Sequence, residues 1–385
     1  MMKICFVADN SADMTGGAQS LLALMLSLKK YGVIPILIGH QDSEQIRQAN
    51  SHGIKTKIIK TKIFVYPQDA NKIIVYAKSV IKRIYNYFRR YAIKRFFLDE
   101  GIELVHLNSV LSGIECAVIA NKMKIPYVWH IREYLDADHG RCIVPENYYK
   151  YTMQKSNALI TISKDVQMHW TNKLGEECRL VYNGFDVNRY YYSATNRFCS
   201  NVVNCIMVGR LNENKRQKDA IDAIKILSQK GVNNVRLTIV GYRKGRAYDE
   251  YIREYIASQQ LQAFVELKGF TDNVRDYYYQ SDIGLMCSTR EAFGRVTIEY
   301  MLSGLLCIGS NTGGTLELIE DGSTGLLYEM GNAKDLANKI EWVLDNPKES
   351  QRILLNGQNN AMKTFSIERT AKEVYSIYQK VLKKE

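Results

Sequence analysis

Two basic residues follow an apolar run that has the length of a strand: Arg210 stands just past its end and Lys215 comes five residues later. The segment is IMVGRLNENKRQKDAIDAI, so the run ends at Gly209 and a helix is predicted from Gln217. Two fixed cations at the end of a strand can hold both phosphates of a diphosphate through charge-assisted hydrogen bonds. Solvated charges on an ordinary surface loop are the alternative for this segment taken alone.

Two carboxylates, Glu291 and Glu299, stand eight residues apart in STREAFGRVTIEYMLSG. If a helix begins near Arg295, Glu291 lies on the preceding loop and Glu299 lies about one turn inside the helix. A carboxylate repels a phosphate, but it accepts hydrogen bonds from the hydroxyl groups of a sugar or a ribose. The alternatives are a solvated loop acid for Glu291 and an ordinary partner of the helix dipole for Glu299.

Two predicted helix starts could assist in binding a phosphate. Gly16 and Gly17 precede a helix over residues 18–30, and paired glycines let the backbone approach a ligand closely. The amides of the second start belong to Phe293, Gly294, Arg295 and Val296. A pair of glycines before a helix is equally common as plain turn chemistry.

Strands and helices alternate along the whole chain. The strand-like runs are KICFVAD, VIPILIG, IKTKII, ELVHL and IPYVWH in the first half, and VVNCIMVG, VRLTIVG, FVELKG, DIGLMCS, LLCIGS and TGLLYE in the second. A polar stretch at residues 43–51 interrupts the first series. The alternation predicts an α/β protein with two Rossmann-like, doubly wound parallel-sheet domains that face a cleft, since ligands of such sheets lie at the carboxyl ends of the strands.

The predicted domains are residues 1–195 and 196–365, with a linker in the turn-rich stretch 189–201. A helix at 366–385 has a broad apolar face, and we expect it to pack back on the N-terminal domain. The length of 385 residues fits two domains, and 46% apolar with 24% charged residues is typical of globular proteins.

Several classes of protein are disfavoured by what the sequence lacks. Neither the G-x-G-x-x-G fingerprint nor a P-loop occurs, which argues against a nicotinamide enzyme and a P-loop NTPase. No DxD-like metal site stands at a strand end, and the eight cysteines lack CxxC spacing, which favours free thiols. We therefore expect no metal and no cofactor. With no signal peptide and no run of eighteen apolar residues, we expect the chain to stay in the cytoplasm.

The motifs together resemble the retaining glycosyltransferases of family 4, which have the GT-B fold. The resemblance rests on Gly16-Gly17, VGRLNENK, the E-x7-E pair from Glu291 to Glu299, ITISK at 160–164, VYNGFDVNRY at 181–190 and NTGGTLELIEDGSTGLLYE at 311–329. The segment HIREYLDADHG at 130–140 is similar to members that build bacterial surface polysaccharides. Such a protein would move a sugar from a nucleotide diphosphate sugar, most simply a UDP-sugar, to a glycan or lipid-linked acceptor.

The resemblance also implies roles for individual residues. Arg210 and Lys215 would hold the diphosphate, assisted by amides near Gly17 and at 293–296. Glu299 would bind the ribose, Glu291 the hydroxyl groups of the transferred sugar, and His130 would lie beside that sugar. Arg132 and Glu133 are candidates for a salt bridge that shapes the acceptor side, with a purely structural role as the alternative.

The stretch from Lys72 to Arg95 carries eight basic residues and no acidic one. The net charge of +12 is concentrated in the first 195 residues, which hold 26 basic against 17 acidic residues. Apolar residues recur in the stretch at helical spacing, at positions 77, 80, 81, 84, 88 and 91. The helix could rest on an anionic membrane at the inner face of the cell membrane through Lys78, Lys82, Arg83, Arg89, Arg90 and Lys94. A core-packed apolar stripe is the favoured alternative, and no nucleic-acid-binding motif is present.

Two further functions fit the same fold. A sugar-nucleotide epimerase would share the donor site but would need catalytic acids for proton removal. A noncatalytic partner of another transferase would have no physical need for all of Arg210, Lys215, Glu291 and Glu299.

Overall fold

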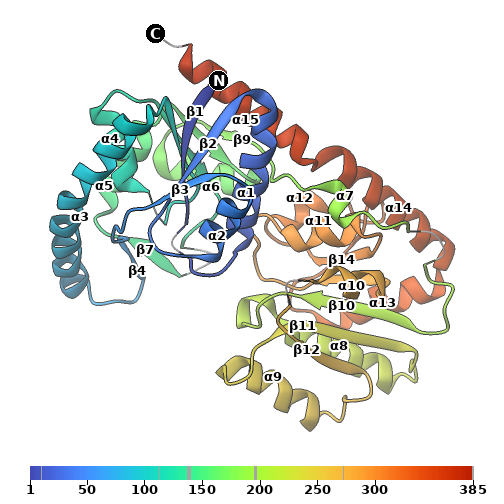
Figure 1. The fold of residues 1–385 in the computed structure, drawn as a ribbon. Helices are drawn as coiled ribbons and strands as arrows, with labels where there is room; N and C mark the ends of the chain where they lie inside the picture. Colours follow the sequence, from blue (N-terminus) through green and yellow to red (C-terminus); the bar gives the residue numbers. More distant parts are fainter. Residues whose placement is uncertain (10, 112, 137–139, 195–196, 272, 384–385) are drawn as a thin grey trace. The chain divides into compact units, whose positions relative to one another are not determined.

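A computed structural model describes residues 1–9, 11–111, 113–136, 140–194, 197–271 and 273–383 (Figure 1). The chain divides into two compact units, Met1–Phe185 with Ile367–Glu385, and Asp186–Ser366. Each unit contains one parallel sheet with helices on both faces. The two sheets confirm the predicted fold class.

The first unit contains seven parallel strands in the order β3-β2-β1-β5-β6-β8-β9. They are β1 (Met2–Val7), β2 (Val33–Gly39), β3 (Lys55–Ile58), β5 (Leu104–Leu107), β6 (Tyr127–Ile131), β8 (Ala158–Thr161) and β9 (Cys178–Leu180), with a small antiparallel pair of β4 (Val65–Pro67) and β7 (Arg141–Ile143). The helices are α1 (Gly16–Leu28), α2 (Glu44–Ser51), α3 (Lys72–Glu100), α4 (Ile114–Lys122), α5 (Glu146–Gln154), α6 (Lys164–Leu174) and α15 (Ile367–Leu382), and a 3-10 turn η1 spans Lys29–Tyr31. Helices α1 and α15 lie on one side of the sheet and α4 on the other (Figure 1).

The central strand β1 is buried on both faces, which explains its continuous apolar run. Ile4 and Phe6 join the core beneath α1 and α15, whereas Cys5 faces Cys116 of α4. Successive side chains therefore point to opposite helix layers, as the period of two in a strand requires.

The second unit contains six parallel strands in the order β12-β11-β10-β13-β14-β15. They are β10 (Val203–Val208), β11 (Val235–Tyr242), β12 (Val265–Gly269), β13 (Ile283–Met286), β14 (Leu306–Ser310) and β15 (Leu326–Tyr328). The helices are α7 (Val187–Tyr190), α8 (Gln217–Gln229), α9 (Ala247–Ser258), α10 (Arg275–Tyr279), α11 (Arg295–Leu302), α12 (Thr315–Leu318), α13 (Ala333–Asp345) and α14 (Pro347–Thr364), and a 3-10 turn η2 spans Glu213–Lys215. The strand order reverses at β1/β5 in the first unit and at β10/β13 in the second, and ligands of such sheets bind at these points.

The predicted boundary between residues 195 and 196 lies outside the described residues, whereas the first compact unit ends at Phe185. The segment that follows already packs in the second unit. Ala194 belongs to its hydrophobic core, and the carbonyl oxygen of Tyr190 accepts a hydrogen bond from the Ser303 hydroxyl at 3.0 Å. Because this stretch is rich in turn-forming residues, its burial in the second unit could not be predicted from its composition.

The C-terminal helix α15 packs against α1 in the first unit. The Tyr375 ring stacks on the Tyr31 ring at 5.0 Å between centroids, and Thr370 donates a hydrogen bond to the Tyr182 carbonyl oxygen at 2.9 Å. Val374 is fully buried. The last helix therefore completes the first sheet's core although the whole second unit precedes it in sequence.

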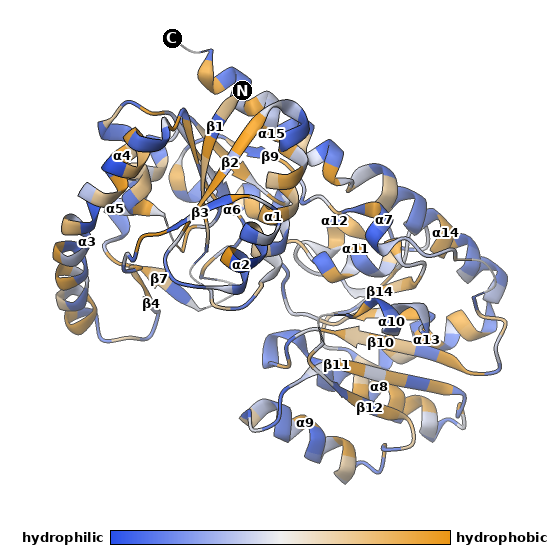
Figure 2. Cartoon of the chain, viewed as in Figure 1, coloured by the Kyte–Doolittle hydropathy of each residue, from blue (hydrophilic) through white to orange (hydrophobic). Residues whose placement is uncertain are grey.

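Helix α3 reverses the amphipathic pattern of a core-packed helix. Two polar residues, Ser79 and Asn86, are buried on its inner face. The other buried residues of the helix are Val75, Ile93, Phe96 and Phe97. Large apolar side chains along its length face outward. These exposed side chains are Ile73, Ile74, Tyr76, Val80, Ile81, Ile84, Tyr87, Phe88, Tyr91 and Leu98. Figure 2 shows the apolar colour recurring along α3. The prediction that the apolar stripe is core-packed is wrong, because its side chains are exposed.

Candidate functional site

The end of β10 positions Arg210 through two close-packed strand ends. A Cβ atom at Gly241 would lie 2.2 Å from the carbonyl oxygen of Gly209, and Gly241 has a φ of +126°. Only glycine fits there, so the carboxyl ends of β10 and β11 can approach each other. Arg210 follows and is exposed, and no carboxylate in the described part of the chain pairs with it. Its guanidinium is available to an anionic ligand.

Lys215 ends the short turn η2, which Asn212 caps by accepting a hydrogen bond from the Lys215 amide at 3.0 Å. The neighbouring cations have structural partners, since Arg216 pairs with Asp219 at 2.6 Å and Lys218 pairs with Asp222 at 2.6 Å. The Lys215 ammonium instead pairs with Glu291, which lies on the loop after β13. The structure thus brings together two residues that are 76 positions apart.

The Glu291 loop is held in place by a glycine pair on a neighbouring loop. Gly314 donates its amide to the Glu291 carbonyl oxygen at 2.8 Å, and a Cβ at Gly314 would lie 2.8 Å from the Phe293 carbonyl oxygen. This close approach explains the glycines of the NTGGT motif. The Ser288 hydroxyl donates to the Glu291 carboxylate at 2.6 Å and fixes the side chain that meets Lys215.

Helix α11 begins at Arg295, as predicted, after Gly294 with a φ of +94°. The amide of Val296 belongs to the first turn, where N–H groups have no acceptor within the helix and the dipole is positive. The Phe293 ring packs against Phe365 at 5.8 Å between centroids, so this residue can offer only its backbone to a ligand.

Glu299 lies one turn inside α11 and is buried. Its carboxylate accepts hydrogen bonds from the Tyr278 hydroxyl at 3.0 Å and from the Arg295 guanidinium at 3.4 Å. Burial, and next the Glu299 charge, raise the pKa of Tyr278, so this tyrosine stays a neutral donor. Glu299 is therefore already oriented by the protein before any ribose hydroxyl could reach it.

In the first unit, the ends of β1, β5 and β6 gather another set of polar groups. Thr15 caps α1, and its hydroxyl donates to the Asp9 carboxylate at 2.7 Å. Asn108 donates to the Gly17 carbonyl oxygen at 3.3 Å and accepts from Arg132 at 2.7 Å. Burial is the main cause that raises the pKa of Asp9. Gly17 and Arg132, both predicted, thus meet through Asn108, which sequence reasoning missed.

His130 is buried in a chain of hydrogen-bonding rings. The Tyr378 hydroxyl of α15 lies 2.7 Å from Nδ1 of His106, and Nε2 of His106 lies 3.3 Å from Nδ1 of His130. Nη2 of Arg132 also lies 3.3 Å from Nδ1 of His130. Because arginine only donates, Nδ1 of His130 presents its lone pair and the proton lies on Nε2. Nε2 has no partner among the described residues.

This geometry predicts that His130 is neutral with its proton on Nε2, because burial and then Arg132 lower its pKa. Nitrogen-15 NMR of histidine-labelled protein near pH 7 should show this tautomer. In Tyr378→Phe, His106 should lose its fixed tautomer, while the exposed His52 serves as the unchanged control. An imidazolium or an Nδ1–H form of His130 in the wild type would contradict the geometry.

Glu133 is buried and serves the framework of the first unit. Its carboxylate accepts from the Ser109 hydroxyl at 2.5 Å and from the Val110 amide at 2.7 Å. Its carbonyl oxygen accepts from the Trp170 indole at 2.8 Å. These hydrogen bonds give Glu133 a structural role in the first unit, and its role on the acceptor side stays a prediction.

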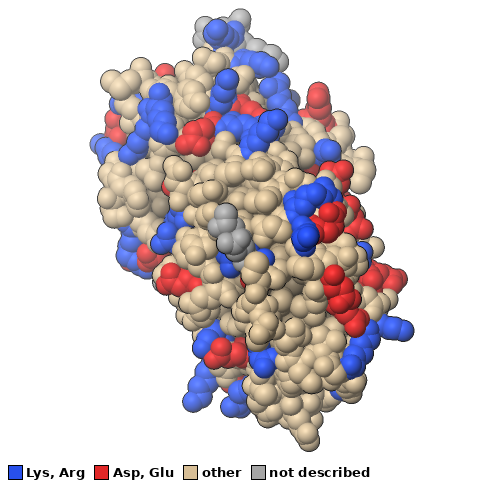
Figure 3. Space-filling model, turned by 90° about the vertical axis from the view of Figure 1, so that its right-hand side faces the viewer, with Lys and Arg blue, Asp and Glu red and all other residues tan. Residues whose placement is uncertain are grey.

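The basic residues of α3 fall into two groups. Lys82 donates to the Ile63 carbonyl oxygen at 2.8 Å, and Arg90 pairs with the buried Glu115 at 2.7 Å. Both are half-buried and already have partners within the protein, so these contacts give no support to their predicted membrane contact. The other four, Lys78, Arg83, Arg89 and Lys94, are exposed. Figure 3 shows another face, where basic and acidic side chains are interspersed.

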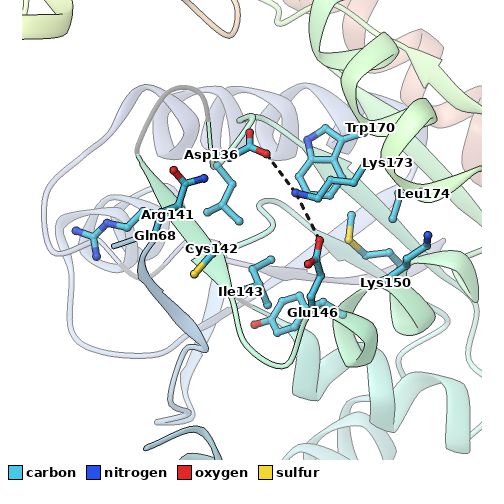
Figure 4. A pocket seen from close by; sticks show the side chains of 13 residues that line it. Gln68, Asp136, Arg141, Cys142, Ile143, Glu146, Lys150, Trp170, Lys173 and Leu174 are labelled. Carbon is cyan, nitrogen blue, oxygen red and sulfur yellow. Dashed lines mark hydrogen bonds and ion pairs between the residues drawn. The ribbon is translucent and has the colours of Figure 1, made fainter. Parts of the chain in front are cut away.

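A cavity of about 180 Å³ in the first unit is lined by none of the predicted site residues (Figure 4). Trp170, Tyr149 and Met153 form apolar parts of its wall. Lys173 lies between Asp136 at 3.3 Å and Glu146 at 3.8 Å, so its charge is already neutralised. Within the described ranges, no cluster of three His, Cys, Asp or Glu could hold a metal ion, and no helix is long and apolar enough to cross a membrane.

Both units match models of known families. Residues 15–189 match "Glycosyltransferase Family 4", and residues 200–360 match "Glycosyl transferases group 1". The chain is 25% identical over 291 residues to an uncharacterized glycosyltransferase, MJ1178, of Methanocaldococcus jannaschii, covering 75% of this chain and 78% of the relative. It is 28% identical to the capsular polysaccharide biosynthesis glycosyltransferase CapM of Staphylococcus aureus, over 46% of each chain.

Solved structures agree on the fold. Anabaena HepE, crystallised in complex with UDP, superposes with a TM-score of 0.82 at 20% identity, covering 98% of this chain and all of the other. The sheet orders, the loops after β10 and β13 and the two family models lead to one conclusion. The chain belongs to glycosyltransferase family 4 and has the GT-B fold.

Proposed function

We propose that this glycosyltransferase moves a sugar from a UDP-sugar to an acceptor with retention of configuration and without a metal ion. The observation that carries the proposal is the loop pair at the β10/β13 switch point, where Arg210 is exposed and Lys215 contacts Glu291. Two cations beside a carboxylate suit a ligand that joins a diphosphate to a sugar. The UDP complex of HepE supports a uridine donor.

Each site residue has a proposed role. Arg210 and Lys215 neutralise the diphosphate, the Val296 amide assists, and Glu299 binds the ribose. Glu291 accepts hydrogen bonds from the transferred sugar. His130 of the first unit, as the Nε2–H tautomer, can donate a hydrogen bond to a sugar oxygen, which a neutral imidazole does without giving up its proton.

The proposed reaction proceeds on one face of the sugar. The bond between the anomeric carbon and the phosphate oxygen breaks, and the acceptor oxygen bonds to the same carbon from the same side. The acceptor proton passes to the leaving phosphate oxygen. The protein contributes positioning and preorganised positive charge, which commonly supply a large share of the rate.

The purified protein with a UDP-sugar alone separates the proposed transferase from the epimerase. Slow release of UDP and free sugar is expected, because water can replace the acceptor. Recovery of an isomerised UDP-sugar would contradict the transferase and favour the epimerase. No turnover, and no rise in melting temperature with any of a panel of nucleotide sugars, would instead favour a noncatalytic partner.

Helix α3 supports a place at the cytoplasmic face of the membrane. Its outward face combines exposed apolar side chains, such as Ile81 at 68% and Phe88 at 73%, with exposed cations, such as Arg83 and Arg89. Apolar side chains can enter the headgroup region while cations meet anionic lipids. An acceptor carried by a lipid would be presented there. The relation to CapM supports a role in the synthesis of a surface polysaccharide.

A further inference from the structure

A second cavity of the first unit, of about 360 Å³, lies between the ends of β2 and β3 and one side of α3. Its lining residues are His40, Gln41, Lys60, Thr61, Lys62, Ile63, Lys82 and Tyr85. Three of them are lysines and none is acidic. A cavity with cations and no carboxylate fits an anion.

The backbone that carries the lysines is fixed against α3. Asn86 accepts from the Lys62 amide at 2.7 Å and donates to the Lys62 carbonyl oxygen at 2.9 Å. At the other end, the Ile59 amide donates to the Gly39 carbonyl oxygen at 2.9 Å. The two hydrogen bonds with Lys62 explain why α3 has a buried asparagine, Asn86, on its inner face. The segment 60–62 is therefore held in position without using the lysine ammonium groups.

The three lysine ammonium groups differ in whether they already have partners within the protein. Lys82 donates to the Ile63 carbonyl oxygen and lies 4.1 Å from the centroid of the Tyr66 ring. Lys62 lies 5.4 Å from the centroid of the Tyr85 ring. Lys60 is exposed, and no carboxylate among the described residues pairs with either Lys60 or Lys62. Two cations can thus bind an anion without first breaking a salt bridge.

The hydroxyl of Thr61 contacts Nδ1 of the buried His40 at 2.7 Å. Burial lowers the pKa of His40 to about 4, so this ring is neutral near pH 7. The positive charge of the cavity therefore comes from the lysines.

We propose that this cavity binds the diphosphate of a lipid-linked acceptor. Tyr85 of α3 lines the cavity and connects it to the apolar face of the helix. The exposed Ile81 and Ile84 lie within about one turn of Tyr85 on the same helix. A prenyl chain can stay in the membrane beside these side chains while its diphosphate meets Lys60 and Lys62. This inference rests on the proposed membrane role and narrows the acceptor to a lipid diphosphate.

Co-sedimentation with phosphatidylcholine vesicles tests the inference without any turnover. Vesicles that contain a long-chain prenyl diphosphate should bind the wild-type protein more tightly than vesicles with the matching prenol. The double variant Lys60→Gln, Lys62→Gln should lose this difference, about tenfold or more in affinity. Lys57→Gln on β3, which removes a nearby exposed charge outside the cavity, should keep it.

Equal binding of wild type and double variant to the diphosphate vesicles would overturn the inference. So would wild-type binding that does not distinguish the diphosphate from the prenol. Inorganic pyrophosphate that displaces the protein at the same concentration as the lipid would show a site for the free anion and overturn the lipid assignment. Phosphatidylglycerol vesicles should bind both proteins through α3, and release of UDP from a UDP-sugar should continue in both, so failure of the proposed function is seen separately.

Discussion

Replacing either Arg210 or Lys215 by alanine is expected to lower kcat on the order of 100-fold or more while the protein stays folded. In the proposed reaction, the leaving diphosphate gains charge as the sugar bond breaks, and these two cations would neutralise it. No carboxylate among the residues that the structure describes pairs with Arg210, and Lys215 is oriented by Glu291 before the ligand arrives. Steady-state transfer of a radiolabelled sugar measures the loss of kcat, and melting curves on the same samples show whether the protein stays folded.

Lys218→Ala is the matched control for these two variants. It removes a charge from the same segment, but Lys218 pairs with Asp222 on α8 and lies over the Tyr255 ring. Its rate should stay within about twofold of wild type, because the pair links two residues of α8 and is not part of the proposed diphosphate site. Near-normal turnover in both Arg210→Ala and Lys215→Ala would remove the main support of the proposed chemistry.

Three acidic substitutions on the outer face of α3, Ile81→Glu, Ile84→Glu and Phe88→Glu, should abolish binding to anionic vesicles. Each of these side chains is exposed. Full burial of each one in the bilayer would stabilise membrane binding by about 1.5 to 3 kcal/mol. The new charges also repel anionic lipids. Co-sedimentation with phosphatidylglycerol vesicles measures the loss, expected to exceed about 100-fold in partitioning.

A control with the same added charge uses exposed apolar residues elsewhere, Met168→Glu, Tyr251→Glu and Leu355→Glu. This variant should sediment with vesicles nearly as well as the wild type. Both triple variants should still release UDP from a UDP-sugar, because neither changes the donor site. If the α3 variant binds vesicles normally, the outer face of α3 has another purpose.

Much of the fold could be predicted from the sequence because its central strands are buried on both faces. The run KICFVAD has no polar alternation and becomes β1. The run VRLTIVG instead alternates buried apolar residues with the half-buried Arg236 and Thr238, which is the period of two of a strand, and becomes β11. The start of α11 at Arg295 could also be predicted, because Gly294 needs the left-handed conformation that ends the preceding loop. Local chemistry was sufficient in these places.

Helix α2 could not be predicted from apolar periodicity. Its inner face has only Ile46 and Ala49 as buried apolar residues, and its start depends on the Ser43 hydroxyl, which accepts from the Ile46 amide. Strand β9 is only three residues long. Such short elements gain their stability from neighbours that are distant in sequence.

The candidate site shows the same division. Arg210, Lys215 and Glu291 were found from strand ends and spacing, but the contact between Lys215 and Glu291 depends on how β10 and β13 pair. The ring chain from Tyr378 through His106 to His130 joins residues 272 and 24 positions apart. Helical spacing predicts α3, but it does not predict which face of the helix turns inward, because the polar partners of Asn86 and Arg90 lie on other segments.

Calorimetry of UDP and UMP binding to the wild type and to Arg210→Ala is the most direct test of whether the loops after β10 and β13 bind a diphosphate. The wild type should bind UDP more tightly than UMP by a factor on the order of ten or more, as expected for a charge-assisted contact to the second phosphate. The variant should bind the two nucleotides with similar affinity. A preference for UDP that survives unchanged in Arg210→Ala would contradict the account.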